Sequence, residues 1–450
     1  MDVRSASGGL WDKAVLSSLL TKAVQGLAGP VTAILILFYF DPEVQGYYYT
    51  FLNLLALQIF VELGLSTVIT IFAAHEWSTL SFDEKQCVTG DPHSFARLAV
   101  LAKRALRWYV AGACILLLVL YVAGSAFLNT PGGGGRSIDW HEPWVALCIL
   151  SAAGLALTPG WALLLGCGQV AEVNRFRMWE TIGRSLVLWA AIASGAQLWA
   201  IVLSAAFSVA WTLTFLVGRY LIFFRSLLTS KAEGVLDWKR EVAPLQWRIA
   251  ISWICGYFAF SFFTPVMFHF LGPMAAGQMG ITWAIISGLS GLAATWAQVR
   301  SPAFANLVAR KEFAALDSLA VKIAAVAVTT SIVASLVVIG GLLSLDYYRP
   351  DLAVRFLPVT AIAVFLLAEF LHQLSIVQST YLRAFKREPF LSVSVVSGAA
   401  IGIGTIMLTG AIGPMGPALS YLTGILLALS WGSWVFVQNW RKWTFPRENK

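Results

Sequence analysis

The sequence has little charge for its length. Only 12% of its 450 residues are Asp, Glu, Lys or Arg, whereas 58% are hydrophobic, and the mean hydropathy is +0.75. A soluble globular chain is about a quarter charged, so one water-surrounded core cannot hide this much apolar surface. The scarcity of charge argues against a soluble protein and predicts an all-α polytopic membrane protein.

Several motifs are also missing. The five cysteines show no C-x-x-C spacing, which argues against a disulfide framework and a metal site, and no cofactor is predicted. No G-x-x-x-x-G-K-[ST] motif occurs, so the chain is not itself an ATP-driven pump. The net charge of +8 comes from cations scattered between apolar runs rather than from a basic stripe, which argues against a nucleic-acid partner. The segment 1–13 lacks a small-residue cleavage pattern, so the first apolar run is expected to be a retained span.

Apolar runs long enough to cross a bilayer recur along the whole chain. A span needs about 20 mostly apolar residues. Twelve segments qualify, at 15–40, 47–73, 108–128, 144–169, 178–195, 199–224, 249–271, 276–299, 319–345, 354–381, 390–409 and 414–437. We therefore predict about twelve transmembrane helices.

The distribution of cations gives this map an orientation. If the N-terminus is cytoplasmic, 27 of the 31 Lys and Arg residues fall in inside segments, three fall outside and Lys22 lies within the first span. The three outside residues are Arg136, Arg349 and Arg355. Cytoplasmic loops are enriched in Lys and Arg, so both termini are predicted to be cytoplasmic.

The two halves of the chain echo each other. Asp41-Pro42-x-x-x-Gly46 closes the first hairpin, and Gly272-Pro273-x-x-x-Gly277 follows the seventh span, 231 residues later. The hydrophilic stretch 225–248 separates six spans from six. We predict a duplicated six-helix unit, with an N-terminal lobe at 1–235 and a C-terminal lobe at 236–450 in parallel orientation around a central cavity.

Polar residues inside the first two spans form stripes. Lys22 and Gln25 share a face of the first span, and Glu62 lies near the middle of the second. Ionisable groups at membrane depth usually face a cavity or a partner. We take Lys22 and Gln25 as candidates for binding an anionic headgroup and Glu62 as a coupling candidate. Snorkelling of Lys22 to the surface, or a Lys22–Glu62 pair, remains open.

Other candidate residues lie in later spans. Arg184, Arg248 and Arg300 are candidate cavity cations, although Arg184 and Arg300 are close enough to the cytoplasmic surface to face lipid headgroups instead. In the seventh span one seam runs from Arg248 to His269, which is a coupling or gating candidate.

The tenth span is the most polar at its centre. Glu369 and His372 are three residues apart and share a face. A carboxylate one turn from an imidazole can act as a proton-sensing pair. A hydrogen-bonded pair that only packs helices is the alternative.

These features together resemble the multidrug, oligosaccharide-lipid and polysaccharide exporter superfamily, most of all its bacterial O-antigen and polysaccharide flippases. The resemblance rests on the six-plus-six plan, the hairpin Phe40-Asp41-Pro42-x-x-x-Gly46-Tyr47 and the step Phe60-Val61-Glu62-Leu63-Gly64-Leu65. It implies alternating access that moves a polyprenyl-diphosphate-linked sugar unit across the bacterial cytoplasmic membrane for polysaccharide or lipopolysaccharide biosynthesis. It also implies a cavity-facing basic residue in span 1, matched by Lys22, and polymerase or glycosyltransferase partners.

Three other functions compete with this one. A cation-coupled multidrug antiporter of the same superfamily would use a buried acid, for which Glu62 or Glu369 would serve. An integral-membrane glycosyltransferase or polymerase needs larger outer loops than this chain has, so no enzyme activity is expected. A carrier of the other large six-plus-six superfamily is disfavoured because its G-x-x-x-D-x-x-G-R-[RK] signature is missing after span 2.

Overall fold

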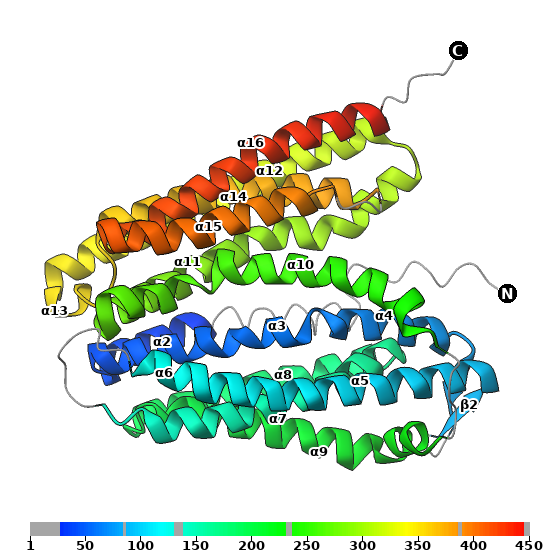
Figure 1. Ribbon diagram of the computed structural model, residues 1–450. Coiled ribbons are helices and arrows are strands. Elements are labelled where there is room, and N and C mark those ends of the chain that lie inside the picture. The colour runs from blue at the N-terminus through cyan, green and yellow to red at the C-terminus, as the bar shows by residue number, and fades with distance from the viewer. Residues whose placement is uncertain (1–27, 84–86, 130–137, 231–235, 386–388, 445–450) are drawn as a thin grey trace. The chain divides into compact units, whose positions relative to one another are not determined.

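The computed structural model describes residues 28–83, 87–129, 138–230, 236–385 and 389–444 of the chain. Apart from one short hairpin, the regular structure in these ranges is helical (Figure 1). The first described helix is Ala28–Tyr39. It is followed by α2 (Pro42–Leu55), η2 (Ala56–Gln58), α3 (Ile59–Glu62), α4 (Leu65–Trp77), β1 (Leu80–Phe82), β2 (Val88–Gly90), α5 (Pro92–Val119), η3 (Leu120–Gly124), α6 (Ser125–Leu128), α7 (His141–Gly166), α8 (Val170–Ala193), α9 (Trp199–Thr229), η4 (Trp238–Val242), α10 (Ala243–Phe260), α11 (Phe263–Ala309), α12 (Phe313–Tyr348), α13 (Pro350–Ala353), α14 (Val359–Arg383), α15 (Leu391–Ile412) and α16 (Met415–Thr444).

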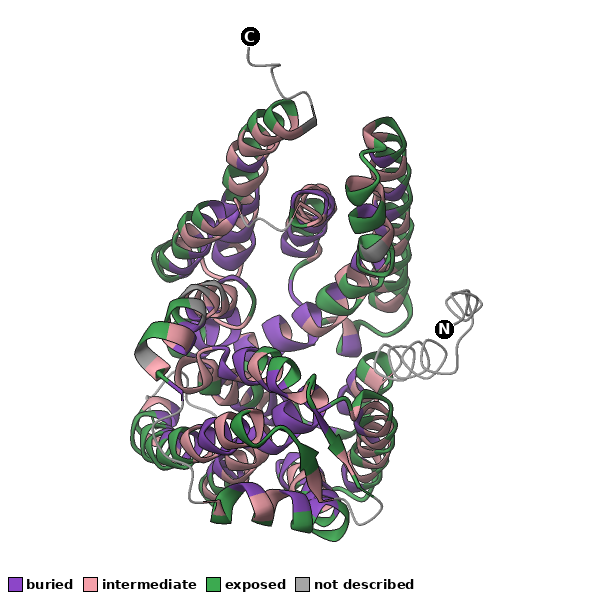
Figure 2. Cartoon of the chain, turned by 90° about the vertical axis from the view of Figure 1, so that its right-hand side faces the viewer, coloured by how far each residue is buried: buried purple, intermediate pink, exposed green. Residues whose placement is uncertain are grey.

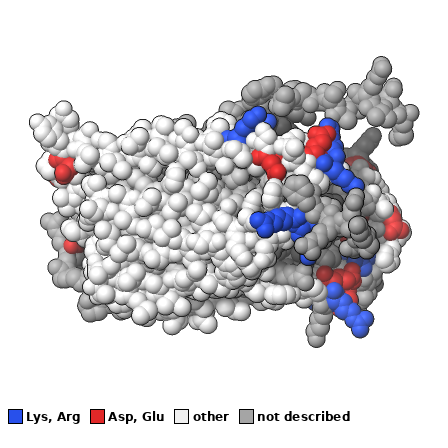
Figure 3. Space-filling model, turned by 90° about the horizontal axis from the view of Figure 1, so that it is seen from above, with Lys and Arg blue, Asp and Glu red and all other residues white. Residues whose placement is uncertain are grey.

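The helices are long and apolar enough for a membrane. Eight helical segments of the described chain qualify as spans by length and composition, or nine if the bent pair Pro42–Glu62 and Leu65–Trp77 is one span. In the face seen in Figure 3, Lys and Arg gather towards one end and uncharged side chains cover most of the remainder. The prediction of a multi-pass α-helical membrane protein is confirmed. The number twelve and the orientation of the termini remain predictions.

The chain divides into two compact units. Of the described residues, unit 1 contains those within 28–39, 54–129 and 138–254, and unit 2 contains those within 40–53 and 255–444. The chain therefore enters unit 2 briefly through most of α2 before it returns to unit 1. Within both units, buried residues face neighbouring helices and exposed residues face outwards (Figure 2).

The second predicted span is broken. Leu63 and Gly64 both adopt left-handed backbone conformations, with φ of 49° and 66°, and the flanking helices are bent by 46°. Such φ values are costly for leucine, but here they let α4 start in a new direction. Trp108 of α5 donates from Nε1 to the carbonyl oxygen of Val61 at 3.2 Å, next to the break. The apolar run around Glu62 gave no sign of this interruption.

The seventh predicted span is also interrupted. Helix α10 ends at Phe260 and α11 begins at Phe263, so the seam predicted between Arg248 and His269 does not lie on one continuous helix. The predicted turn is in the right place, because Gly272 is non-helical inside α11, with φ of 85°.

Helix α8 begins earlier than expected. The predicted span was 178–195, whereas the helix starts at Val170, so Arg175 and Arg177 lie on a helix rather than in a loop. Glu172 in its first turn forms two hydrogen bonds with Arg219 of α9, at 2.9 and 2.8 Å. This pair joins α8 to α9 within unit 1.

A short hairpin links α4 to α5. Strands β1 and β2 pair antiparallel, and Asp91 then caps α5 by accepting a 2.8 Å hydrogen bond from the backbone N–H of Ser94. Pro92 follows at the first helical position, where a missing N–H costs little. Cap and proline together define where α5 begins.

Candidate functional site

The predicted cation site is only partly described. Lys22 and Gln25 lie outside the described residues, as does the side chain of Arg248. Arg184 is exposed in unit 1, and Arg300 is exposed in unit 2 near the end of α11. The assignment of these residues to one cavity therefore stays a prediction.

Glu369 is the most deeply buried acidic candidate. This residue of α14 is 4% exposed. Its Oε2 accepts a 2.6 Å hydrogen bond from Ser290 Oγ of α11, and its Oε1 accepts a 2.7 Å bond from Tyr421 OH of α16. His372 Nδ1 lies 3.5 Å from Oε2. Three helices of unit 2 thus supply polar groups to one carboxylate, where the sequence had indicated only the histidine.

Aromatic rings surround this carboxylate. Trp283 lies within 5.0–5.6 Å of three other rings, measured between centroids, and these are Phe263, Phe365 and Tyr421. Phe260 lies 5.8 Å from the His372 ring. Glu369 therefore lies in a buried, aromatic part of unit 2 rather than at an open anion site.

One further polar atom at this cluster, Gln373 Oε1, is buried without a hydrogen-bond partner among the described residues. His372 Nδ1 instead faces the Glu369 carboxylate at 3.5 Å. Gln373 Nε2 donates to Ser290 Oγ at 3.1 Å, which leaves its amide oxygen facing no donor. Unsatisfied buried polar groups are uncommon, and this one lies beside the Glu369–His372 pair. The amide oxygen therefore has unused capacity to accept a hydrogen bond or a cation.

Helix α8 carries the clearest set of exposed cations in unit 1. Arg177 and Arg184 are both exposed and are seven residues apart, which places them two turns apart on one face. The Arg177 guanidinium lies 5.7 Å above the Trp161 ring of α7. Arg175 is exposed as well but points about 200° away from Arg177 around the helix. The sequence predicts Arg184 as a cavity cation but not Arg177, because Arg177 precedes the apolar run 178–195.

The acidic residues of α8 are already engaged. Glu172 accepts from Arg219 and also from Tyr220 OH at 2.6 Å. Glu180 accepts a short hydrogen bond from Ser208 Oγ of α9. Both carboxylates are partly buried, so the exposed charged side chains of α8 are its arginines.

Glu62 lies at the break in the second span. Its Oε1 accepts from Ser66 Oγ at 2.5 Å and from Tyr109 OH at 3.4 Å. The carboxylate is half-buried next to the start of α4, where a helix N-terminus favours negative charge. Glu62 therefore stabilises the broken helix in this structure. His269 is exposed, and its ring lies 5.1 Å from Phe270.

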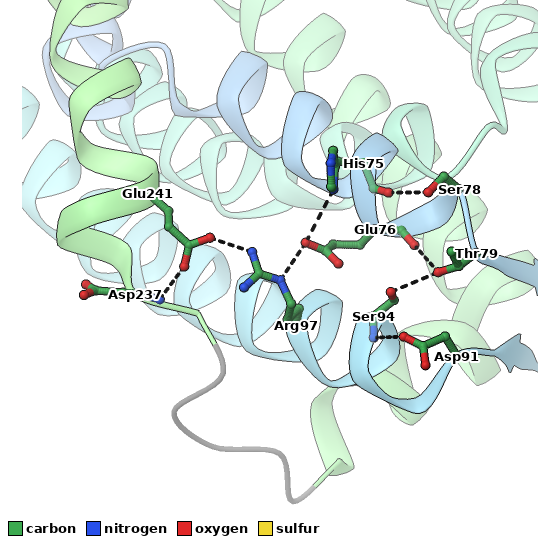
Figure 4. A network of polar contacts seen from close by, with 9 residues as sticks. All are labelled: His75, Glu76, Ser78, Thr79, Asp91, Ser94, Arg97, Asp237 and Glu241. Carbon is green, nitrogen blue, oxygen red and sulfur yellow. Dashed lines mark hydrogen bonds and ion pairs between the residues drawn. The ribbon is translucent and has the colours of Figure 1, made fainter.

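An ion-pair network joins the ends of several elements of unit 1 (Figure 4). The Arg97 guanidinium of α5 lies 2.8 Å from Glu76 of α4 and 2.6 Å from Glu241, in the segment before α10. The hydrogen bond from Arg97 lowers the pKa of Glu241 below its usual value. This network attaches the entry of α10 to α4 and α5.

Solved structures with the same fold are membrane transporters. The chain is similar to a multidrug resistance MATE family transporter of the MOP superfamily in an inward-facing conformation, with a TM-score of 0.67 and 12% identity over 94% of this chain and 98% of that one. It is equally similar to the lipid II flippase MurJ in an inward closed conformation, with a TM-score of 0.67 and 12% identity over 96% of this chain and 90% of that one.

A third similar structure is the MATE multidrug transporter DinF-BH. The TM-score is 0.64 at 12% identity, over 96% of this chain and 95% of that one. No protein-family model and no curated protein matches the sequence. At this identity the comparisons establish a shared fold and leave the substrate open.

Proposed function

We propose that this protein is a flippase that moves a polyprenyl-diphosphate-linked oligosaccharide across the bacterial cytoplasmic membrane by alternating access. The observation that carries the proposal is the exposed face of α8, where Arg177 and Arg184 present positive charge while the helix's own acids are satisfied. A diphosphate-sugar headgroup is anionic and strongly hydrated, so it needs cations along its path.

The magnitude of the attraction suits transport. Opposite charges about 4 Å apart gain roughly 1 to 4 kcal/mol at effective dielectric constants of 80 to 20. Two arginines on α8, together with Lys22 and Arg248, would hold a diphosphate firmly enough to select it and weakly enough to release it. The polyprenyl tail would remain in the lipid. Polymerases or glycosyltransferases that use the same lipid-linked unit are the proposed partners.

We assign the coupling of transport to proton binding to residues of unit 2. Glu369 and the partly buried His372 form a carboxylate–imidazole pair, which supports proton coupling. Glu62 and His269 are weaker candidates, because Glu62 has a structural role at the break and His269 is exposed.

Deletion of the gene tests whether the protein moves a lipid-linked oligosaccharide. Cells that lack the protein should accumulate lipid-linked oligosaccharide that faces the cytoplasm, and the Lys22→Ala variant should accumulate it with normal protein level. No accumulation in the deletion strain would rule out the flippase. Normal export with Lys22→Ala would instead leave Lys22 as a snorkelling residue.

A cation-coupled multidrug antiporter is the second candidate, and the buried Glu369 among aromatic rings favours it. Such a transporter would protect cells from lipophilic cations and would leave lipid-linked oligosaccharide levels unchanged on deletion. Measuring sensitivity to lipophilic cations and the level of lipid-linked oligosaccharide in the same deletion strain therefore distinguishes the two functions.

A further inference from the structure

Arg355 is a buried cation held by a neutral partner. The residue lies between α13 and α14 of unit 2 and is 9% exposed. Its Nε and Nη2 donate to one and the same oxygen, Oε1 of Gln45 in α2, at 3.1 and 2.6 Å. Asp41 is close enough to interact with its charge, but within the described ranges the structure shows no ion pair to Arg355. The guanidinium charge is thus balanced only weakly.

The edge of the guanidinium that bonds Gln45 carries Nε and Nη2, and this edge has the geometry to bind an oxyanion. The Nε and Nη groups of arginine are arranged to donate in parallel to two oxygens of a phosphate or carboxylate. In this structure a single amide oxygen receives both bonds. Gln45 therefore occupies the position of an anion without supplying negative charge.

The orientation of the Gln45 amide follows from its other contacts. Its Nε2 donates to the carbonyl oxygens of Gly277 at 2.8 Å and Arg355 at 3.3 Å. Since both of these groups only accept, the nitrogen must face them and the amide oxygen must face the guanidinium. Gln45 is 1% exposed, so its bonds are protected from water.

The segment that carries Gln45 is connected at both ends to the other unit. Residues 40–53 belong to unit 2, whereas the chain before Phe40 and after Asn53 belongs to unit 1. Loss of Gln45 would leave Arg355 as a buried charge without an acceptor, which is strongly unfavourable.

We propose that Arg355 is a phosphate-type anion site that exchanges Gln45 for two oxygens of the ligand. Anion binding would then be coupled to the release of α2 from unit 2, because the bound anion replaces Gln45 as the acceptor for the Arg355 guanidinium. The identity of the anion as the diphosphate of a lipid-linked sugar rests on the proposed function. The site lies in a region predicted to be outside, where the headgroup would arrive after crossing.

Binding of inorganic pyrophosphate to the purified full-length protein in detergent tests the exchange. Gln45→Ala removes the competing acceptor and should raise the affinity about tenfold over the unchanged protein, as expected for one charge-assisted contact of about 1.4 kcal/mol. Gln45→Ala combined with Arg355→Gln should lose this gain and bind pyrophosphate more weakly than the unchanged protein, because the site itself is removed. Binding to other cations is common to all variants and cancels in these comparisons. Equal affinity with and without Gln45→Ala, or a gain that survives Arg355→Gln, would overturn the proposal.

Two further variants serve as controls. Arg349→Gln changes an arginine six residues earlier that already pairs with Asp351 at 3.0 and 2.9 Å, and it should not alter the gain seen with Gln45→Ala. Gln45→Glu places a carboxylate against Arg355 and should show no extra pyrophosphate binding. Extra binding in Gln45→Glu would contradict the exchange. If deletion cells accumulate no lipid-linked oligosaccharide but these results hold, the flippase proposal fails and the anion site stands.

Discussion

Gly46 and Pro273 touch through their backbones. A Cβ atom on Gly46 would lie 1.9 Å from the carbonyl oxygen of Pro273, and a Cβ on Gly277 would lie 3.0 Å from the carbonyl oxygen of Pro42. The two Pro-x-x-x-Gly motifs, 231 residues apart in the sequence, therefore cross so that each glycine faces the proline of the other. Reciprocal contacts of this kind are expected at a two-fold axis. The duplicated six-helix unit itself stays a prediction.

The close backbone contact between Gly46 and Pro273 predicts that Gly46→Ala lowers the stability of the folded protein. The added methyl group would meet backbone atoms that cannot move aside, and overpacking of this kind costs about 1–3 kcal/mol. Gly288→Ala is the matched control, because a Cβ at Gly288 has no atom within 4 Å. Thermal unfolding in detergent should show a clearly lower midpoint for Gly46→Ala and an unchanged or slightly higher one for Gly288→Ala. Equal midpoints would show that the close contact does not persist in solution.

The exposed face of α8 predicts a charge-specific loss of export. Arg177→Ala and Arg184→Ala should each lower export by about tenfold, since each removes roughly 1.4 kcal/mol of attraction for the anionic headgroup. Arg175→Ala removes the same charge from another face and should have little effect. Cytoplasm-facing lipid-linked oligosaccharide in cells with matched protein levels is the measurement. An equal loss in all three variants would indicate a general effect of charge.

Glu369 predicts a change in the pH dependence of export. Glu369→Gln keeps a group that accepts hydrogen bonds from Ser290 or Tyr421 but cannot bind a proton, so export should be low and insensitive to pH. Tyr421→Phe removes one donor and leaves the acid, so the pH dependence should persist. Measuring the rate of export into vesicles at several pH values distinguishes the Glu369→Gln variant from the Tyr421→Phe variant. A Glu369→Gln variant with normal, pH-dependent export would assign coupling elsewhere.

The Arg97–Glu241 pair predicts an acid-sensitive contribution to stability. Arg97 lowers the pKa of Glu241 below its usual value of 4.5, so the contribution is complete above that value and is lost as the pH falls through the lowered pKa. Glu241→Gln should have a lower unfolding midpoint than the unchanged protein at pH 7, and the two midpoints should converge as the pH falls through the lowered pKa of Glu241. Arg97→Gln should show the same convergence. A difference between variant and unchanged protein that is constant over this range would contradict the assignment.

The spacing of residues along single helices was sufficient for part of the site. Glu369 and His372 were expected to meet because they are one turn apart, and the structure places His372 Nδ1 3.5 Å from the carboxylate. The turn at Gly272 was found from its Gly-Pro pair, since a glycine tolerates positive φ and proline lacks a backbone donor. Such features depend on neighbours in the chain.

The partners from other helices could not be predicted in this way. Ser290 and Tyr421 bond to Glu369 across 79 and 52 residues, and Gln45 meets Arg355 across 310. The break at Leu63 and Gly64 was missed as well, because the apolar run continues through it and its support comes from Trp108 of another helix. Contacts of this kind arise from how helices pack, and no local pattern encodes them.

The sequence by itself determined that this is a multi-pass helical membrane protein. The thickness of a bilayer sets the length of apolar segments, and every backbone group must be satisfied within the segment that crosses it. The tertiary structure alone decided which polar groups are already satisfied and which are left to act on a ligand. That distinction between the paired acids of α8 and its exposed arginines, and between Arg355 and its neutral partner Gln45, depends on helix packing in three dimensions.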